Sequence, residues 1–336
     1  MIEADKQTDK EGLLAPAAHW PEGMPLSDEA VQQARQHAAV AIQRFIATEQ
    51  LPQTYATVFS RLLIPMGAWL LREQRRVGRP LQVAIGGSQG SGKSTFTHGL
   101  RLVLHHCFAV SSCVLSLDDF YLPRDQRQAL ARAIHPLLIT RGVPGTHDLE
   151  LLARTISRLK TADPQDATRI PMFDKNNDDR AAVEAHHIVH GRPGIIFVEG
   201  WCLGARPQTE KELEQPINEL EASEDVQGHW RQYVNRQLAG PYQELCEDFD
   251  HFCFLKAPSW DAVKRWRLTQ EAKLIRNLGD DYRGHLDHGE AFEHFMAHYE
   301  RITRQLLAAP AENADMLLEL DELQRFERLR LHFSHS

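Results

Sequence analysis

Residues 81–95 read Leu81-Gln-Val-Ala-Ile-Gly-Gly-Ser-Gln-Gly-Ser-Gly-Lys-Ser-Thr95, a short apolar run that enters a glycine-rich turn. The part from Gly87 to Ser94 fits the pattern G-x-x-x-x-G-K-S/T of a phosphate-binding loop. In such a loop, backbone N–H groups ahead of a helix N-terminus surround the negative charge of a polyphosphate. The stretch therefore predicts a nucleotide triphosphate site between a buried strand and a helix over Thr95–His106.

Each position of this loop has an expected role. The glycines let the backbone approach the phosphates without a Cβ in the way. Lys93 is expected to reach the β- and γ-phosphates, and the hydroxyl of Ser94 is expected to ligate Mg²⁺. A plain glycine-rich turn is the alternative, and the flanking strand and helix disfavour it. The predicted nucleotide-binding residues are Gly87, Ser88, Gln89, Gly90, Ser91, Gly92, Lys93, Ser94 and Thr95.

The composition is that of an ordinary globular protein. The chain has 336 residues, of which 42% are hydrophobic and 25% charged, enough for one large domain plus an extension. A net charge of −8 without a basic stripe argues against a nucleic-acid partner. Five cysteines without C-x-x-C spacing indicate reduced thiols. Because neither a signal peptide nor a membrane-length apolar run is apparent, we expect a soluble, cytoplasmic protein without a membrane partner; its oligomeric state stays open.

The chain divides into three expected parts. Residues 1–26 are polar and contain prolines, which predicts an irregular or disordered lead. Residues 27–79 predict a helical extension packed on the core, with one helix capped by Ser27 and a second kinked at Pro65. Residues 80–336 predict a P-loop domain with strands near 81, 108, 194, 250 and 315 that alternate with helices. This alternation predicts an α/β fold with a doubly wound, parallel, five-stranded sheet flanked by helices.

Carboxylates follow two of the predicted strands. Asp118 and Asp119 come directly after the strand expected over Cys107–Leu117, and Glu199 follows the apolar run 193–198. In an open α/β sheet, ligands bind at the carboxyl ends of the strands, so we expect Asp118 and Glu199 near the phosphate-binding loop. Asp119 is equally consistent with a capped turn.

Two charged loops add further polar side chains. Taken alone, each loop is better explained by turns and solvated charges than by a site. Between them the two loops contain Arg141, His147, Asp148, Asp174, Lys175 and Arg180.

A basic helix is expected over Trp260–Leu274, and it carries Arg265 and Arg267. Such residues usually form a solvated face, but in a phosphotransferase the helix can close over the triphosphate as a lid. The acidic stretch Gln208–Glu224 is expected to be an exposed excursion. The run His186–His190 has no suitably spaced acidic ligand, so we do not interpret it as a metal site.

The remaining sequence separates the classes that use a phosphate-binding loop. Neither the guanine-reading motif Asn-Lys-x-Asp nor a Leu-Ser-Gly-Gly-Gln stretch occurs, which disfavours a GTPase and a transporter-type ATPase. A kinase remains. Six ordered segments then closely resemble the D-glycerate 3-kinase family of plants and fungi and its bacterial relatives, within the wider group of phosphoribulokinase, uridine kinase and pantothenate kinase. They are Gly86–Thr95, Ser116–Leu122, Arg141–Leu149, Pro171–Lys175 with Asp179–Ala181, Phe197–Gly204 and Arg265–Glu271.

The resemblance covers about residues 80–325 and implies roles for single residues. It implies direct in-line transfer from ATP·Mg²⁺, with Asp118 as base toward the acceptor hydroxyl. The implied catalytic residues are Lys93, Asp118, Glu199, Arg265 and Arg267, and the implied Mg²⁺ ligands are Ser94, Asp118 and Glu199. The implied acceptor side consists of Tyr121, Arg141, His147, Asp148, Asp174, Lys175 and Arg180.

The acceptor is expected to be a small molecule, with D-glycerate and its product 3-phosphoglycerate first. A carboxylate needs an arginine or lysine fork, for which Arg141, Lys175 and Arg180 are candidates. Compared with the plant enzymes, the segment between Lys175 and Arg180 is shorter and a proline after Tyr299 is missing. Two alternatives therefore stay open: a nucleoside or pantothenate-like acceptor, and an ATP-binding regulatory module that binds a partner through residues 1–80.

Overall fold

The computed structural model describes residues 26–278, 289–308 and 314–332. The lead that the sequence predicts over residues 1–26 lies, apart from Leu26, outside the described residues. Among the described residues, no helix combines the length and the apolar character that crossing a membrane requires.

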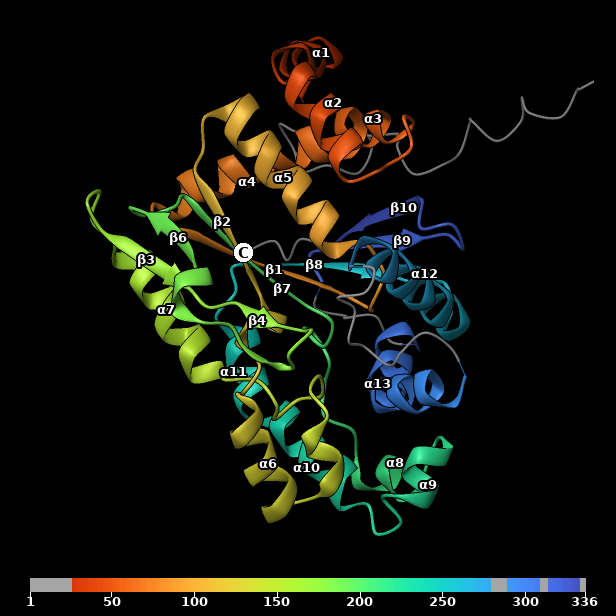
Figure 1. Cartoon of the computed structure of the whole chain (residues 1–336). Coiled ribbons are helices and arrows are strands. Elements are labelled where there is room, and N and C mark those ends of the chain that lie inside the picture. The colour runs from red at the N-terminus through yellow and green to blue at the C-terminus, as the bar shows by residue number, and fades with distance from the viewer. Residues whose placement is uncertain (1–25, 279–288, 309–313, 333–336) are drawn as a thin grey trace, which may run out of the picture.

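A six-stranded sheet with the order β10-β9-β8-β1-β7-β2 forms the centre of the molecule (Figure 1). The strands from β9 to β2 are parallel, which confirms the predicted five-stranded parallel sheet in an α/β fold. The sixth strand, β10, pairs antiparallel with β9 and was not predicted, because its charged, alternating residues lie at the exposed edge. The strands span Leu81–Gly87 (β1), Ser112–Ser116 (β2), Ile195–Gly200 (β7), His251–Lys256 (β8), Met316–Leu320 (β9) and Phe326–Leu331 (β10).

Helix α5, which follows the phosphate-binding loop, is longer than the sequence indicated. It spans Lys93–Phe108 and ends where Ala109 adopts a left-handed conformation with φ 54°. The expected strand over Cys107–Leu117 is therefore wrong at its beginning, since Cys107 still belongs to the helix and β2 starts at Ser112. Further along the chain, two helices, α10 (His229–Ala239) and α11 (Pro241–Glu247), follow each other closely and stay separate because proline cannot continue the helical hydrogen bonding.

The N-terminal helices pack on α5 and share its hydrophobic core. Before Pro65 the helix adopts one π-helical turn over Phe59–Leu63, which accommodates the missing N–H of the proline. Close approach of α4 to α5 depends on Gly67 and Gly99, where an added Cβ would lie 2.7 Å from Val103 and 2.8 Å from Leu63, respectively. These helices are α1 (Asp28–His37), α2 (Ala39–Thr48), α3 (Tyr55–Val58) and α4 (Ile64–Val77).

The remaining helices complete the layers around the sheet. In Figure 1, α4 and α5 lie on one side of the sheet with α1–α3 beyond them, whereas α7, α10 and α11 lie on the other side. Helices α12 and α13 contact each other near the edge formed by β9 and β10. Their bounds are Arg124–Ala133 (α6), Leu149–Thr161 (α7), Trp260–Leu278 (α12) and Glu290–Ala308 (α13).

Two small antiparallel sheets lie outside the main sheet. One pairs β3 (Ala167–Ile170) with β6 (His187–His190), so the histidine run becomes a strand. The other pairs β4 (Phe173–Asp174) with β5 (Asp179–Arg180) and presents the second charged loop.

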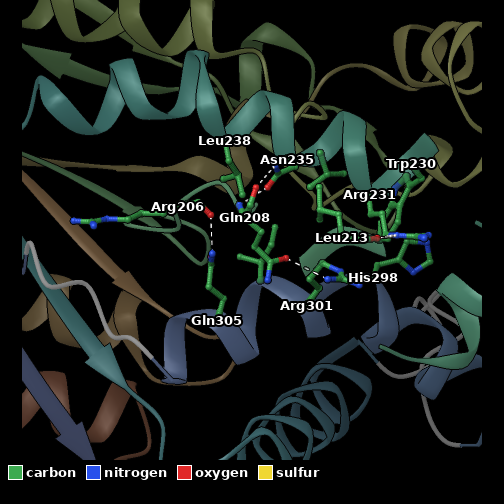
Figure 2. A pocket seen from close by; sticks show the side chains of 12 residues that line it. Arg206, Gln208, Leu213, Trp230, Arg231, Asn235, Leu238, His298, Arg301 and Gln305 are labelled. Carbon is green, nitrogen blue, oxygen red and sulfur yellow. Dashed lines mark hydrogen bonds between the residues drawn. The ribbon is translucent and has the colours of Figure 1, made fainter. Parts of the chain in front are cut away.

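The expectation of an exposed excursion is confirmed for most of Gln208–Glu224, where only Leu213, Leu220 and Glu221 are buried. The segment forms α8 (Glu210–Glu214) and α9 (Glu219–Ser223), and Glu221 is fully buried in an ion pair with Arg301 of α13. Gln208 and Asn235 also exchange two hydrogen bonds between backbone and side chain, as Figure 2 shows. One acidic residue of the segment, Glu221, is thus neutralised by an arginine of a neighbouring helix and not by solvent.

Candidate active site

The phosphate-binding loop connects β1 to α5 at the carboxyl edge of the sheet. Gly90 and Gly92 have φ values of 72° and 85°, which side chains rarely adopt. A Cβ on Gly90 would lie 2.8 Å from the Cβ of Trp266, so the predicted lid helix α12 rests directly on the loop. Lys93 donates a 3.0 Å hydrogen bond to the carbonyl oxygen of Ser88, which holds its ammonium group over the loop.

Glu199 lies beside the loop because β7 pairs with β1 in a register that sets it opposite Ile85. It is 6% exposed, and its Oε1 accepts a 2.7 Å hydrogen bond from the hydroxyl of Ser94. A hydroxyl and a buried carboxylate at this distance offer the hard oxygen ligands that Mg²⁺ prefers. Ser94 and Glu199 therefore fit Mg²⁺, whereas both oxygens of the third predicted ligand, Asp118, have other partners. Among the described residues, no group of three or more His, Cys, Asp or Glu could hold a metal ion by itself.

Asp118 follows β2, whose neighbour in the sheet is β7. One carboxylate oxygen accepts a 2.8 Å hydrogen bond from Tyr121 and the other pairs with Lys175 at 2.6 Å. Burial raises the pKa of Asp118, but the charge of Lys175 and these two hydrogen bonds outweigh it and lower the pKa below the usual carboxyl range. Asp118 is therefore ionised at neutral pH and accepts hydrogen bonds.

His147 lies behind Tyr121, whose ring it stacks upon with 4.6 Å between the ring centroids. Its Nδ1 contacts the hydroxyl of Tyr242 in α11, while its Nε2 is buried without a partner among the described residues. Burial lowers the pKa of His147 to about 4, against the opposing effect of Asp118, so the ring is neutral at neutral pH.

Arg141 is held by Asp178, a residue that the sequence interpretation did not select. One Asp178 oxygen pairs with Arg141, and the other lies 3.0 Å from Arg127, which is fully buried. The Arg141 guanidinium also lies over the ring of Phe173, 5.6 Å from its centroid. These contacts fix a cation beside the acceptor loops.

Asp148 and Asp174 have local structural partners. Asp148 caps α7 by accepting from Leu151, and its second oxygen accepts a 3.2 Å hydrogen bond from Arg180. Asp174 accepts from the backbone of Asn177 and from its side chain in its own turn. The structure thus brings Lys93, Ser94, Glu199, Asp118, Tyr121, His147 and Lys175 together, whereas Asp148, Asp174 and Arg180 support the loops around them.

The side chains of the two arginines on α12, Arg265 and Arg267, point to different partners. Arg265 pairs with Glu322 in the turn between β9 and β10 and is half exposed. Arg267 pairs with Glu271 and is mostly buried. The positive charges of Arg267 and Arg141 both oppose the burial that raises the pKa of Tyr299. Arg267 therefore lies on the side of Tyr299 and Arg141, whereas Arg265 lies against the turn between β9 and β10.

Comparison with known proteins gives the family. No protein-family model matches the chain. A relative from Schizosaccharomyces pombe, named as uncharacterized kinase mug58, is 30% identical over 228 residues, which cover 63% of this chain and 79% of that protein. The chloroplastic D-glycerate 3-kinase of Arabidopsis thaliana is 30% identical over 203 residues, 58% of this chain but only 42% of that protein. The chain belongs to the D-glycerate 3-kinase family of P-loop kinases.

A solved structure agrees with this kinase fold. The D-glycerate 3-kinase of Cryptococcus neoformans superimposes with a TM-score of 0.65 at 24% identity, over 81% of this chain and 99% of that one. At this identity the likeness shows the fold. The family places this kinase among the ATP-dependent phosphotransferases that act on small molecules.

A cavity elsewhere in the kinase is too small for a substrate. It lies between α10, α13 and the segment before α8, and Figure 2 shows Trp230, His298 and Arg301 around it. Its volume of about 20 Å³ suffices for a single water molecule. This cavity is therefore not an alternative to the loop and strand edge as the candidate nucleotide site.

Sequence interpretation missed several residues that shape the site. Arg127, Asp178, Tyr242 and Tyr299 reach it from separate elements, and Tyr299 donates a 2.9 Å hydrogen bond to the carbonyl oxygen of Arg141. The resemblance covered the positions of Tyr242 and Tyr299, but no local pattern distinguishes them from ordinary core tyrosines.

Proposed function

We propose that this kinase transfers the γ-phosphoryl group of Mg·ATP to the 3-hydroxyl of D-glycerate and forms 3-phosphoglycerate. The observation that carries the proposal is the position of Asp118, between Tyr121 and Lys175 and next to the Ser94–Glu199 pair. The acceptor itself is inferred from the similarity to the D-glycerate 3-kinase of Arabidopsis thaliana.

In an in-line transfer, different residues of the chain have separate roles. Asp118 orients the acceptor hydroxyl and takes its proton; because such transition states are loose, a weak base suffices. Lys93 and Arg267 stabilise the charge on the transferred group. Ser94 and Glu199 would hold Mg²⁺, which when bound neutralises phosphate charge.

A small carboxylic acid suits the cations next to Asp118. Each candidate cation for a carboxylate already has an acidic partner, since Arg180 pairs with Asp148, Arg141 with Asp178 and Lys175 with Asp118. Lys175 is half exposed, so it can turn from Asp118 toward a bound anion. Because glycerate is small, its carboxylate and its reacting hydroxyl must bind close together, and the proximity of Lys175 to Asp118 satisfies this requirement.

The aromatic side chains speak against a nucleoside acceptor. A base needs a free ring face, yet Tyr121 stacks on His147 and Phe173 is covered by Arg141 and Arg127. Trp201 is 3% exposed and donates to the carbonyl oxygen of Gly142. These contacts favour a small polar acceptor.

The regulatory-module alternative finds little support in the N-terminal helices. Phe59, Leu62 and Trp69 are fully or almost fully buried in the same core as the sheet. Deletion of residues 1–80 would therefore remove core packing as well as any partner site.

An ADP-release assay with Mg·ATP tests the proposal. D-glycerate, L-glycerate, uridine, pantothenate and ribulose 5-phosphate are supplied separately, and Lys93→Ala is the blank. We expect release with D-glycerate alone and a 3-phosphate product. Consumption of only uridine or pantothenate would overturn the glycerate assignment.

A further inference from the structure

Tyr242 has an unusual hydrogen-bonding position behind the acceptor loop. It is 2% exposed, and its hydroxyl oxygen accepts a 3.2 Å hydrogen bond from the backbone N–H of Gly145. A hydrogen bond from the backbone N–H of His147 to the same oxygen lowers the pKa of Tyr242, as the bond from Gly145 does. Burial nevertheless raises the pKa of Tyr242 well above its usual value, so the hydroxyl keeps its proton. With its oxygen already accepting, Tyr242 has this proton left to donate.

The partner for that proton is Nδ1 of His147, which lies 2.5 Å from the Tyr242 oxygen. In the part of the chain that the structure describes, no other acceptor forms a hydrogen bond with Tyr242. Nδ1 is therefore an acceptor and carries no proton. Since His147 is neutral at neutral pH, its single ring proton must be on Nε2.

The Nε2–H group of His147 is a buried donor without a partner among the described residues. His147 is 6% exposed and stacks on Tyr121, whose hydroxyl donates to Asp118. A buried N–H without an acceptor is unfavourable, and proteins rarely leave one unpaired. Near Asp118, an oxygen of a bound acceptor molecule would provide the partner that this N–H lacks.

We propose that Tyr242 is a positioning residue that fixes His147 as the Nε2–H tautomer, and that His147 then donates a neutral hydrogen bond to a second oxygen of the bound acceptor. The inference rests on the proposed function, because it concerns the same pocket. It adds that His147 provides a hydrogen-bond donor to the acceptor and that Tyr242 fixes the tautomer that makes this possible. A buried donor of this kind selects acceptors with a hydroxyl or carboxylate oxygen at that point and rejects analogues that lack it.

The tautomer can be measured directly. Long-range ¹H–¹⁵N spectra of the full chain with labelled histidine report which ring nitrogen carries the proton, and the signal of His147 is the one lost in His147→Gln. We expect the Nε2–H form at neutral pH in the wild-type chain. A wild-type Nδ1–H form or an imidazolium would overturn the inference, whether or not any acceptor is phosphorylated.

Tyr242→Phe tests the positioning role, with Tyr233→Phe as the matched control. Tyr233 packs against the same Gly145, where an added Cβ would lie 2.6 Å from its ring. Among the described residues, the hydrogen-bonding and ring partners of the His147 side chain are Tyr242 and Tyr121, and not Tyr233. We expect Tyr242→Phe to lose the single tautomer and to raise KM for the acceptor by about tenfold, with KM for ATP unchanged. Tyr233→Phe should change neither.

The outcomes separate this inference from the proposed function. An unchanged tautomer and an unchanged acceptor KM in Tyr242→Phe would overturn the positioning role. If the tautomer is as expected and is lost in Tyr242→Phe, but D-glycerate is not phosphorylated, the positioning role stands and the proposed acceptor fails. Because the wild-type tautomer is measured without Tyr242→Phe, the inference can be tested even if that variant folds poorly.

Discussion

Ser94 and Glu199 are separated by 105 residues in the chain, yet a 2.7 Å hydrogen bond joins them at the carboxyl ends of neighbouring strands. The pairing register of β1 and β7 creates this contact. The contact places the hydroxyl of the phosphate-binding loop next to the carboxylate that ends β7, where both could bind Mg²⁺.

Glu199→Gln is expected to weaken Mg²⁺ use. The amide keeps a hydrogen-bond acceptor for Ser94 but loses the negative charge that favours a divalent cation. We expect the Mg²⁺ concentration for half-maximal turnover to rise by about 10–100-fold, the usual effect of altering a metal site's supporting groups. Turnover measured against free Mg²⁺ at saturating ATP checks this, and an unaltered Mg²⁺ dependence would exclude Glu199 from the metal site.

Gly90→Ala is expected to damage ATP binding more than backbone strain alone explains. Gly90 combines a φ of 72° with a Cβ position 2.8 Å from Trp266. Gly78→Ala is the matched control, because Gly78 has a φ of 67° and nothing within 4 Å of an added Cβ. Each variant should lose about 1–2 kcal/mol of stability from the left-handed conformation.

Only Gly90→Ala should also weaken ATP affinity, because α12 must move away from the loop. Thermal unfolding with and without ATP measures both effects. Equal loss of ATP affinity in the two variants would contradict the contact between loop and lid.

Arg267→Ala is expected to lower kcat far more than Arg265→Ala. Arg267 lies on the side of Tyr299 and Arg141, whereas Arg265 pairs with Glu322 at the surface. Loss of one charge-stabilising group in phosphoryl transfer costs on the order of 10²–10³-fold in rate. Arg265→Ala should stay within a few-fold of wild type. Steady-state kinetics of both variants at saturating substrates decide the point, and the reverse order would assign the inward role to Arg265.

His298 makes stability depend on pH. It is 3% exposed, and burial lowers its pKa to about 4. A pKa that is lower in the folded chain means that the unfolded chain binds more protons between about pH 6.5 and pH 4. The contribution of neutral His298 is therefore fully present above pH 6.5 and is lost as the pH falls toward 4.

His298→Gln should flatten this dependence by about 1 kcal/mol per pH unit between pH 6 and pH 5, relative to wild type. His106→Gln, at an exposed position of α5, serves as control and should leave the slope unchanged. Urea unfolding at several pH values measures the slope. An identical slope in wild type and His298→Gln would show that His298 is already protonated in the folded chain.

The sequence by itself determined the fold class and the nucleotide end of the site. The loop motif, the apolar strand before it and the carboxylates after two other strands are local signals, because each depends on residues next to one another in the chain. Parallel pairing then brings all strand ends to one edge, so Lys93, Asp118 and Glu199 meet there without further information.

Only the tertiary structure decided the other side of the pocket. The pairing of Asp178 with Arg127 and Arg141, the direction of Arg267 and the contact of Tyr242 with His147 each join separate elements. A charged residue in a polar loop has the same local sequence whether it faces solvent or a buried arginine. Its partner depends on how helices and loops pack over the sheet, which is decided by the whole core at once.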